Sequence, residues 1–184
     1  MKRFRRSQVA MLVLLPLLVS CSTVYPRQNP VGVEFPQIKG DSLDEREVSI
    51  PADFAGEETL LLIGYEMDSQ FDIDRWLFGL NQAEVVLPIY ELPTIRGLVP
   101  GMISDVINQG MRSGIPDEDW AIVVTIYDDA DVVAAFLGNE TPLPARVVLL
   151  DKSGRIAFFH DRGYSTGTLI KLREALERLR SEQG

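Results

Sequence analysis

Short apolar runs alternate with segments of helical periodicity from Thr59 to the C-terminus. Such runs are typical of strands buried on both faces, and their alternation with helices predicts parallel strand pairs. The last two runs are joined by Asp151–Gly154, a hairpin loop with glycine where positive φ is needed, so the closing pair is expected to be antiparallel. The sequence therefore predicts an α/β fold, a mixed sheet flanked by helices. The expected strands are 59–65, 84–90, 120–127, 145–150 and 155–160, and the expected helices are 71–82, 100–112, 130–137 and 168–180.

Two local features refine this arrangement. Pro88 lies inside the second expected strand. Because proline donates no backbone hydrogen bond, it favours an edge position or an early end to that strand. Asp128 and Asp129 precede the third helix, and we expect them to cap its N-terminus.

The first twenty residues have the pattern of a secretory signal. A basic segment, Met1–Gln8, precedes an apolar run of 11 residues, Val9–Val19. A membrane-spanning helix needs about 20 such residues. A basic start, a short apolar run and small residues after it predict a signal peptide over residues 1–20. An N-terminal membrane anchor and a buried helix are the alternatives.

The motif after the apolar run, Leu18-Val19-Ser20-Cys21, resembles the lipobox of bacterial lipoproteins. The resemblance implies that the Cys21 thiol carries diacylglycerol, that the signal is cut before it, and that the new amine is acylated, for example by palmitate. Several acyl chains, at about 0.8 kcal/mol per buried CH₂, anchor a protein stably. The expected location is the cell envelope, facing the periplasm. Ser22, where Asp favours inner-membrane retention, favours the outer membrane.

The residues after Cys21 divide into two expected parts. Residues 21–33 are polar, contain Pro26 and Pro30, and have no apolar periodicity. We expect this segment to be a tether that lifts the domain off the membrane. Residues 34–184 are expected to form one domain.

The chain contains one cysteine and one histidine, which excludes several classes of site. A single cysteine forms no intramolecular disulfide, no CxxC pair and no cysteine-rich zinc site. If Cys21 carries lipid, the mature protein has no thiolate for peroxidase, exchange or protease chemistry. The net charge of -9 disfavours nucleic-acid binding. Neither GxGxxG nor a Walker A motif occurs, so no nucleotide site is expected.

The order of elements resembles the thioredoxin fold, from about Phe35 to the C-terminus. The segment 35–51 resembles the N-terminal hairpin of peroxiredoxins and membrane-tethered thioredoxin-like proteins, with Glu45 where these have glycine. A further resemblance, over 97–138 and 149–156, is to mitochondrial assembly factors that chaperone the membrane sector of ATP synthase. Those factors also have a thioredoxin-like fold without an active CxxC.

Leu143-Pro144-Ala145 resembles the cis-proline segment of thioredoxins. The resemblance implies that the Leu143–Pro144 bond is cis and faces the loop 66–70. Leu143 would then offer its backbone N–H and C=O to an incoming extended chain, as in strand addition. Pro142 is the alternative cis residue.

The position of the dithiol in active thioredoxins corresponds to residues 65–71 of this chain, which contain no cysteine. We expect this stretch and the proline segment to form a binding surface. The alternative is a capped loop left over from a redox ancestor. The candidate binding residues are Tyr65, Glu66, Met67, Asp68, Ser69, Gln70, Leu143 and Pro144.

Catalytic and metal sites have weaker support. The acidic residues Glu66, Asp68, Asp72 and Asp74 could attract Ca²⁺ or Mg²⁺, but their spacing is not that of an EF-hand loop. Adjacent strand residues point to opposite faces, which argues against His160–Asp161 as a catalytic pair. Ser69 has no GxSxG elbow. We therefore expect no metal, cofactor or catalytic residue.

The functional prediction is a lipid-anchored, redox-inactive thioredoxin-fold protein that is not an enzyme. It would bind another polypeptide in the bacterial cell envelope, in an assembly or chaperone-like role. The alternative is an enzyme, or a carrier of a small ligand or metal, that uses the acidic loop around Asp68.

Overall fold

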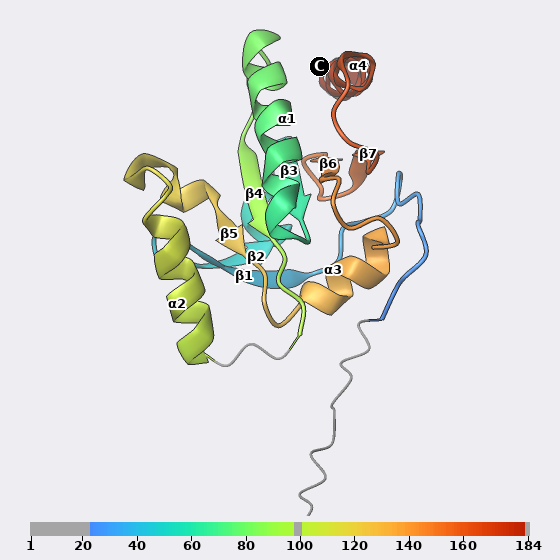
Figure 1. Ribbon diagram of the computed structural model, residues 1–184. Coiled ribbons are helices and arrows are strands. Elements are labelled where there is room, and N and C mark those ends of the chain that lie inside the picture. Colours follow the sequence, from blue (N-terminus) through green and yellow to red (C-terminus); the bar gives the residue numbers. More distant parts are fainter. Residues whose placement is uncertain (1–22, 98–100, 183–184) are drawn as a thin grey trace, which may run out of the picture.

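The computed structural model describes residues 23–97 and 101–182 (Figure 1). The expected signal peptide, Cys21 and Ser22 lie outside these residues. Within the described part of the chain, every helix is too short or too polar to cross a bilayer.

A four-stranded mixed sheet forms the centre of the molecule, in the order β4-β3-β6-β7. β3 pairs with β4 in parallel, whereas the β3–β6 and β6–β7 pairs are antiparallel. This confirms the predicted α/β class and the antiparallel closing hairpin. The strands are β3 Thr59–Gly64, β4 Ile89–Pro93, β6 Arg146–Leu150 and β7 Ile156–His160, and the α-helices are α1 Gln70–Gln82, α2 Gly101–Arg112, α3 Ala130–Leu137 and α4 Thr166–Glu182.

The sheet is buried on both faces, as its apolar runs predict. Leu60 and Leu62 of β3 pack with Trp76 of α1 and with α4. Leu61 and Ile63 face the opposite core, which contains residues of α3. Figure 1 shows α1 and α4 on one side of the molecule and α3 on the other. Successive side chains of a strand point to opposite faces, so one apolar run contributes residues to both hydrophobic cores.

A second, three-stranded sheet has the order β2-β1-β5. β1 and β2 form the expected N-terminal hairpin, and Glu45 in its turn has a φ of 70°. This is the left-handed conformation that glycine adopts most readily, so the turn keeps its shape with glutamate in that place. The strands are β1 Ile38–Ser42, β2 Glu47–Ile50 and β5 Val124–Thr125, and the 3₁₀ helices are η1 Ala52–Phe54, η2 Met67–Ser69 and η3 Asp117–Ile122.

Two strands differ from the prediction. The strand expected at 84–90 begins only at Ile89, because Glu84 adopts a positive φ and Pro88 follows; β4 lies at the edge of the four-stranded sheet. The strand expected at 120–127 is reduced to β5, because η3 occupies residues 117–122. β5 pairs with β1, and only single bridges connect its neighbours to β4.

The expected cap of α3 is also different. Asp129 precedes α3, but its side chain makes no capping hydrogen bond. Its carboxylate instead accepts a hydrogen bond from the backbone N–H of Lys39, at 2.8 Å. Asp129 therefore ties the N-terminal hairpin to the start of α3.

Residues 23–33, which we expected to belong to a tether, lie against the domain; we call them the strap. The backbone N–H of Tyr25 donates to the Asn139 side chain at 2.6 Å. The Arg27 guanidinium pairs with the buried Asp161 at 2.5 Å. The sequence pattern does not indicate this docking because most of these contacts are polar and join residues more than 100 positions apart.

Candidate functional site

The loop that replaces the dithiol position is closed by its own hydrogen bonds. η2 begins after Glu66 with a capping box: the Glu66 N–H donates to the Ser69 hydroxyl at 3.3 Å, and the Glu66 side chain accepts from the Ser69 backbone. Ser69 is fully buried, and its hydroxyl donates to the carbonyl of Pro142 at 3.3 Å. The proline segment therefore lies beside the loop 66–70, as expected. Ser69 holds the two segments together and is not exposed.

The prediction of a cis bond at Leu143–Pro144 is wrong. Among the described residues the cis peptide bond is Ile50–Pro51, so the bonds before Pro142 and Pro144 are both trans. The carbonyls of Pro142 and Pro144 both accept hydrogen bonds from Arg146, at 3.2 and 2.6 Å. These carbonyls are therefore satisfied from within the protein. Strand addition at Leu143 was expected because of a cis bond. Since the bond is trans, that structural basis is absent.

Arg146 and Tyr65 form the floor of the site. The Arg146 guanidinium carbon lies 4.4 Å from the centroid of the Tyr65 ring, and Arg146 also donates to the carbonyl of Gly138 at 3.2 Å. Burial raises the pKa of Tyr65 to about 12 and lowers the pKa of Arg146. Tyr65 is mostly covered, so it supports the surface from below.

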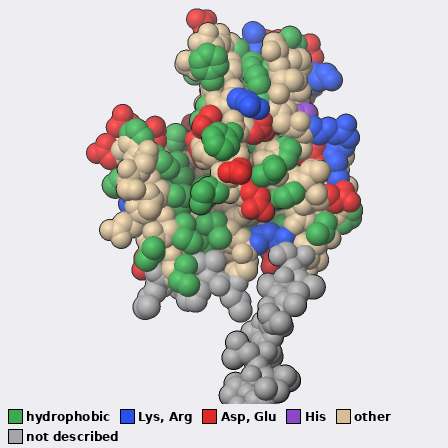
Figure 2. Space-filling view, viewed as in Figure 1, with side chains coloured by type: hydrophobic (Ala, Val, Ile, Leu, Met, Phe, Trp, Pro, Cys, Tyr) green, Lys and Arg blue, Asp and Glu red, His purple; other side chains and the backbone are tan. Residues whose placement is uncertain are grey.

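Three exposed apolar side chains lie on the two segments that the Ser69–Pro142 hydrogen bond joins; we call Met67, Phe71 and Leu143 the apolar patch. Their exposed fractions are 92%, 68% and 53%. Met67 and Phe71 are four positions apart, and the Ser69–Pro142 hydrogen bond brings Leu143 to the same loop. Figure 2 shows hydrophobic and acidic side chains interspersed over this face. Contiguous exposed apolar groups mark interaction surfaces. Phe71 was not among the predicted binding residues, although it ends the stretch that replaces the dithiol.

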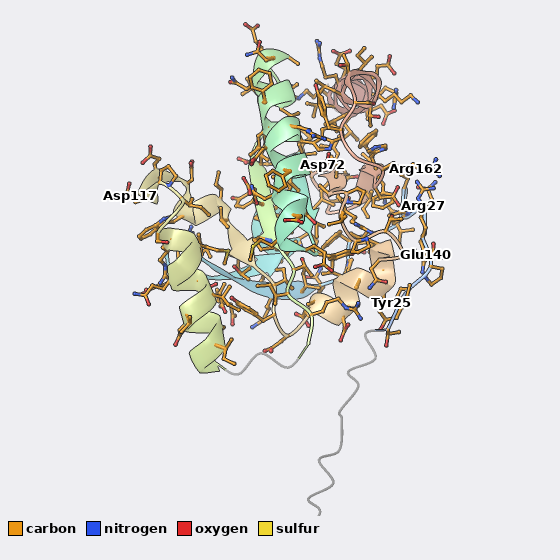
Figure 3. The ribbon with its side chains drawn as sticks, viewed as in Figure 1. Tyr25, Arg27, Asp72, Asp117, Glu140 and Arg162 are labelled. Atoms are coloured by element: carbon orange, nitrogen blue, oxygen red, sulfur yellow. The ribbon has the colours of Figure 1, made fainter. Side chains whose placement is uncertain are left out.

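The acidic residues of the loop do not converge on one point. Asp72 is buried, and its two carboxylate oxygens accept hydrogen bonds from the backbone N–H groups of Tyr164, at 2.8 Å, and Ala145, at 3.0 Å (Figure 3). Asp74 accepts from the side chain of Gln70 at 3.0 Å. No group of three or more acidic, histidine or cysteine side chains within the described ranges has the geometry to hold a metal ion.

His160 and Asp161 have separate partners. The His160 Nε2 atom lies 2.8 Å from the Gly163 carbonyl, and its ring packs edge-on against the buried Trp76. Asp161 pairs with Arg27 of the strap. Each side chain therefore has its own partner elsewhere in the fold.

Two hollows lie outside the predicted site. The strap borders a cavity of about 230 Å³. Two of the residues that line it have a buried atom without a hydrogen-bond partner, Oδ1 of Asp161 and Nε of Arg146. A wider groove of about 860 Å³ separates α2 from the β1–β2 turn and is lined by Arg112 and Trp120. Sequence reasoning missed both, since each joins segments distant in sequence. The cavity is lined by Arg27, Gly138, Glu140, Thr141, Arg146, Asp161 and Arg162.

Comparison with protein-family models gives no match, and no curated protein matches the sequence. Solved structures do match the fold. A thiol peroxidase from Chromobacterium violaceum has a TM-score of 0.56 and 11% identity, over 85% of this chain and 92% of that chain. A SCO1/SenC family lipoprotein from Bacillus anthracis has a TM-score of 0.53 and 10% identity, over 84% and 99%.

A third match is the thioredoxin domain of a thiol-disulfide oxidoreductase from Bacteroides vulgatus. Its TM-score is 0.50 and its identity 19%, over 79% of this chain and 98% of that chain. At such identities a likeness establishes the fold and not the activity. The chain therefore has a thioredoxin-like fold.

Proposed function

We propose that this protein is a lipid-anchored, redox-inactive thioredoxin-fold protein that binds another polypeptide in the bacterial cell envelope. The observation that carries the proposal is the apolar patch, which lies at the stretch that the resemblance to thioredoxins matches to their dithiol. Met67 of η2 and Phe71, in the first turn of α1, expose large apolar side chains there. Exposed aromatic and methionine side chains are enriched in protein interfaces.

The lack of thiols supports binding without redox chemistry. Cys21 is the only cysteine of the chain, and it lies in the lipobox-like motif. A domain beginning after Cys21 has no thiolate to attack a disulfide or a peroxide. The matching thiol peroxidase and oxidoreductase are redox proteins by name, and this chain shares their fold but contains no cysteine after Cys21.

Anchoring in the envelope is supported by the motif and by one structural match. The SCO1/SenC family protein from Bacillus anthracis is a lipoprotein. In this chain, Cys21 would carry the lipid, with the domain in the periplasm and Ser22 favouring the outer membrane. An assembly or chaperone-like role agrees with the resemblance to assembly factors of this fold that lack CxxC.

The alternative, an enzyme or a small-ligand or metal carrier at the acidic loop, has less support. Both oxygens of Asp72 are used by backbone N–H groups, and Asp74 binds the Gln70 side chain. Asp68 is exposed, and among the described residues no group of three or more acidic, histidine or cysteine side chains could hold a metal ion.

Co-purification from detergent-solubilised membranes tests the proposal. The full-length tagged protein is compared with Phe71→Asp and Leu143→Asp, which place a charge in the apolar patch. Phe78→Asp is the matched control, because Phe78 lies on α1 and its exposed fraction, 67%, nearly equals that of Phe71. We expect a specific polypeptide to be retained by the wild type and the control and lost from both patch variants. Equal retention by all four proteins would overturn the proposal.

A further inference from the structure

We infer that the strap holds the α3 side of the domain against the membrane, so that the apolar patch meets a polypeptide located at the membrane surface. The inference rests on the proposed lipid anchor at Cys21 and extends it. A free tether would allow the domain to turn and to reach partners far from the bilayer. A docked strap limits the distance between lipid and domain and keeps the side from which the strap emerges nearest to the bilayer.

The N-terminal end of the strap is bound to the loop after α3. Asn139 makes three hydrogen bonds with it: its side chain accepts from the Tyr25 N–H at 2.6 Å and donates to the Thr23 carbonyl at 3.2 Å, and its N–H donates to the Tyr25 carbonyl at 3.1 Å. The Tyr25 ring also stacks with Arg96, whose guanidinium pairs with Asp131 of α3. The chain is therefore fixed from Thr23 onward.

The rest of the strap is held as firmly. The Arg27 N–H donates to Glu140 at 3.0 Å, and the Arg27 side chain pairs with Asp161 (Figure 3). Further along, the N–H of Gly32 donates to the Ile156 carbonyl at 2.8 Å. A Cβ atom at Gly138 would lie 2.6 Å from the Pro26 carbonyl oxygen, so the strap passes directly over this glycine.

Chain geometry then limits the distance between lipid and domain. One residue, Ser22, separates Cys21 from Thr23. Consecutive Cα atoms are 3.8 Å apart, so the Cys21 Cα lies within about 8 Å of the Thr23 Cα. The tether expected over residues 21–33 would instead allow about 40 Å. The docked strap brings the α3 side of the domain to the level of the lipid headgroups.

The same loop connects the anchored side to the apolar patch. Asn139 binds the strap. Three residues later, the carbonyl of Pro142 accepts a hydrogen bond from Ser69 of the loop 66–70. Figure 1 shows the N-terminal end of α1 directed toward α3 and the connection between α1 and β4 at the opposite end of the molecule. The patch therefore lies on the membrane-proximal half of the domain, which favours a membrane-attached partner.

Site-directed labelling of the acylated full-length protein in vesicles tests this orientation. Because Cys21 would be consumed by lipid, a single added cysteine can be labelled selectively. Val132→Cys places a fluorophore on the exposed surface of α3, and Val86→Cys places it in the exposed connection between α1 and β4. With nitroxide-headgroup lipids in the vesicles, we expect at least threefold stronger quenching at position 132 than at position 86. Equal quenching at both positions would overturn the inference.

A strap variant and an acylation control separate the possible failures. Arg27→Ala combined with Asn139→Ala should reduce the difference between the two labels to less than twofold while the domain keeps its circular dichroism spectrum. An unchanged difference would show that the strap does not set the orientation. A protein that lacks acyl mass and does not bind vesicles would overturn the proposed anchor itself. A patch-dependent partner found only in the soluble periplasmic fraction would overturn the inference while leaving the binding function intact.

Discussion

The guanidinium of Arg146 lies over the ring of Tyr65, 4.4 Å from its centroid, directly beneath the loop that replaces the dithiol. Arg146 is 1% exposed and binds the carbonyls of Gly138, Pro142 and Pro144. One buried side chain thus fixes the floor of the apolar patch and the backbone of the proline segment. The site depends on this contact for its shape.

Replacing Arg146 should destabilise the domain. Arg146→Ala leaves the buried carbonyls of Gly138 and Pro144 without their donor. The carbonyl of Pro142 keeps the Ser69 hydroxyl as its donor. An unmade buried hydrogen bond costs about 1–3 kcal/mol. We expect the free energy of unfolding to fall by about 3 kcal/mol in urea denaturation. Arg146→Lys keeps the charge but loses the planar fork, so its loss should be intermediate. An Arg146→Ala protein as stable as the wild type would show that these contacts contribute little.

Asp72 is predicted to be structural. Asp72→Ala removes the acceptor of two backbone N–H groups, those of Ala145 and Tyr164. We expect a loss of about 2–3 kcal/mol in the free energy of unfolding. Asp74→Ala, on the exposed side of the same helix, should change it by at most about 0.5 kcal/mol. Similar small effects for both variants would contradict the structural role of Asp72 and would revive the acidic-loop alternative.

Stability should decline at alkaline pH. Burial raises the pKa of Tyr65 and of Tyr127 to about 12, whereas an unfolded tyrosine titrates near pH 10. Between about pH 10 and 12 the unfolded chain therefore binds fewer protons than the folded chain, and stability falls as pH rises. The share of Tyr65 is about 2–3 kcal/mol. Denaturation at several pH values should show a shallower decline for Tyr65→Phe, and an unaltered slope would argue against a buried Tyr65 hydroxyl.

The lipid anchor has its own test. Cys21→Ser should leave an unprocessed precursor without acyl mass, because a serine hydroxyl does not replace the thiol in lipobox processing. Intact-protein mass spectrometry of the wild type should show acyl chains and no signal peptide. A mature wild-type chain with a free thiol would contradict the anchor.

Much of the fold was predictable from hydrophobic periodicity. The helix expected at 130–137 has the bounds Ala130–Leu137, and β6 and β7 begin within one residue of their predicted starts. The apolar residues of these segments recur at the spacing that burial at the central sheet requires. The strand expected at 120–127 is reduced to β5, because the residues before it form η3. The position of η3 depends on packing against β1 and β4.

The candidate site was predictable only in outline. The neighbourhood of Ser69 and Pro142 followed from the fold resemblance, and the structure confirms it. The trans bond before Pro144 is the usual geometry of such bonds, and the resemblance to the cis-proline segment predicted the exception. The docked strap depends on hydrogen bonds of Asn139 with backbone groups more than 100 positions away. No periodic pattern records such contacts, so the sequence could not reveal them.

The central claim, that the apolar patch contacts a polypeptide, is tested most directly by site-specific photo-crosslinking in living cells. A photoreactive phenylalanine analogue is placed at Phe71, at Leu143 or, as control, at Val86, which is exposed in the connection between α1 and β4. We expect one discrete polypeptide adduct from positions 71 and 143, found in the membrane fraction and absent from position 86. Adducts of equal yield from all three positions, or none from positions 71 and 143, would contradict it.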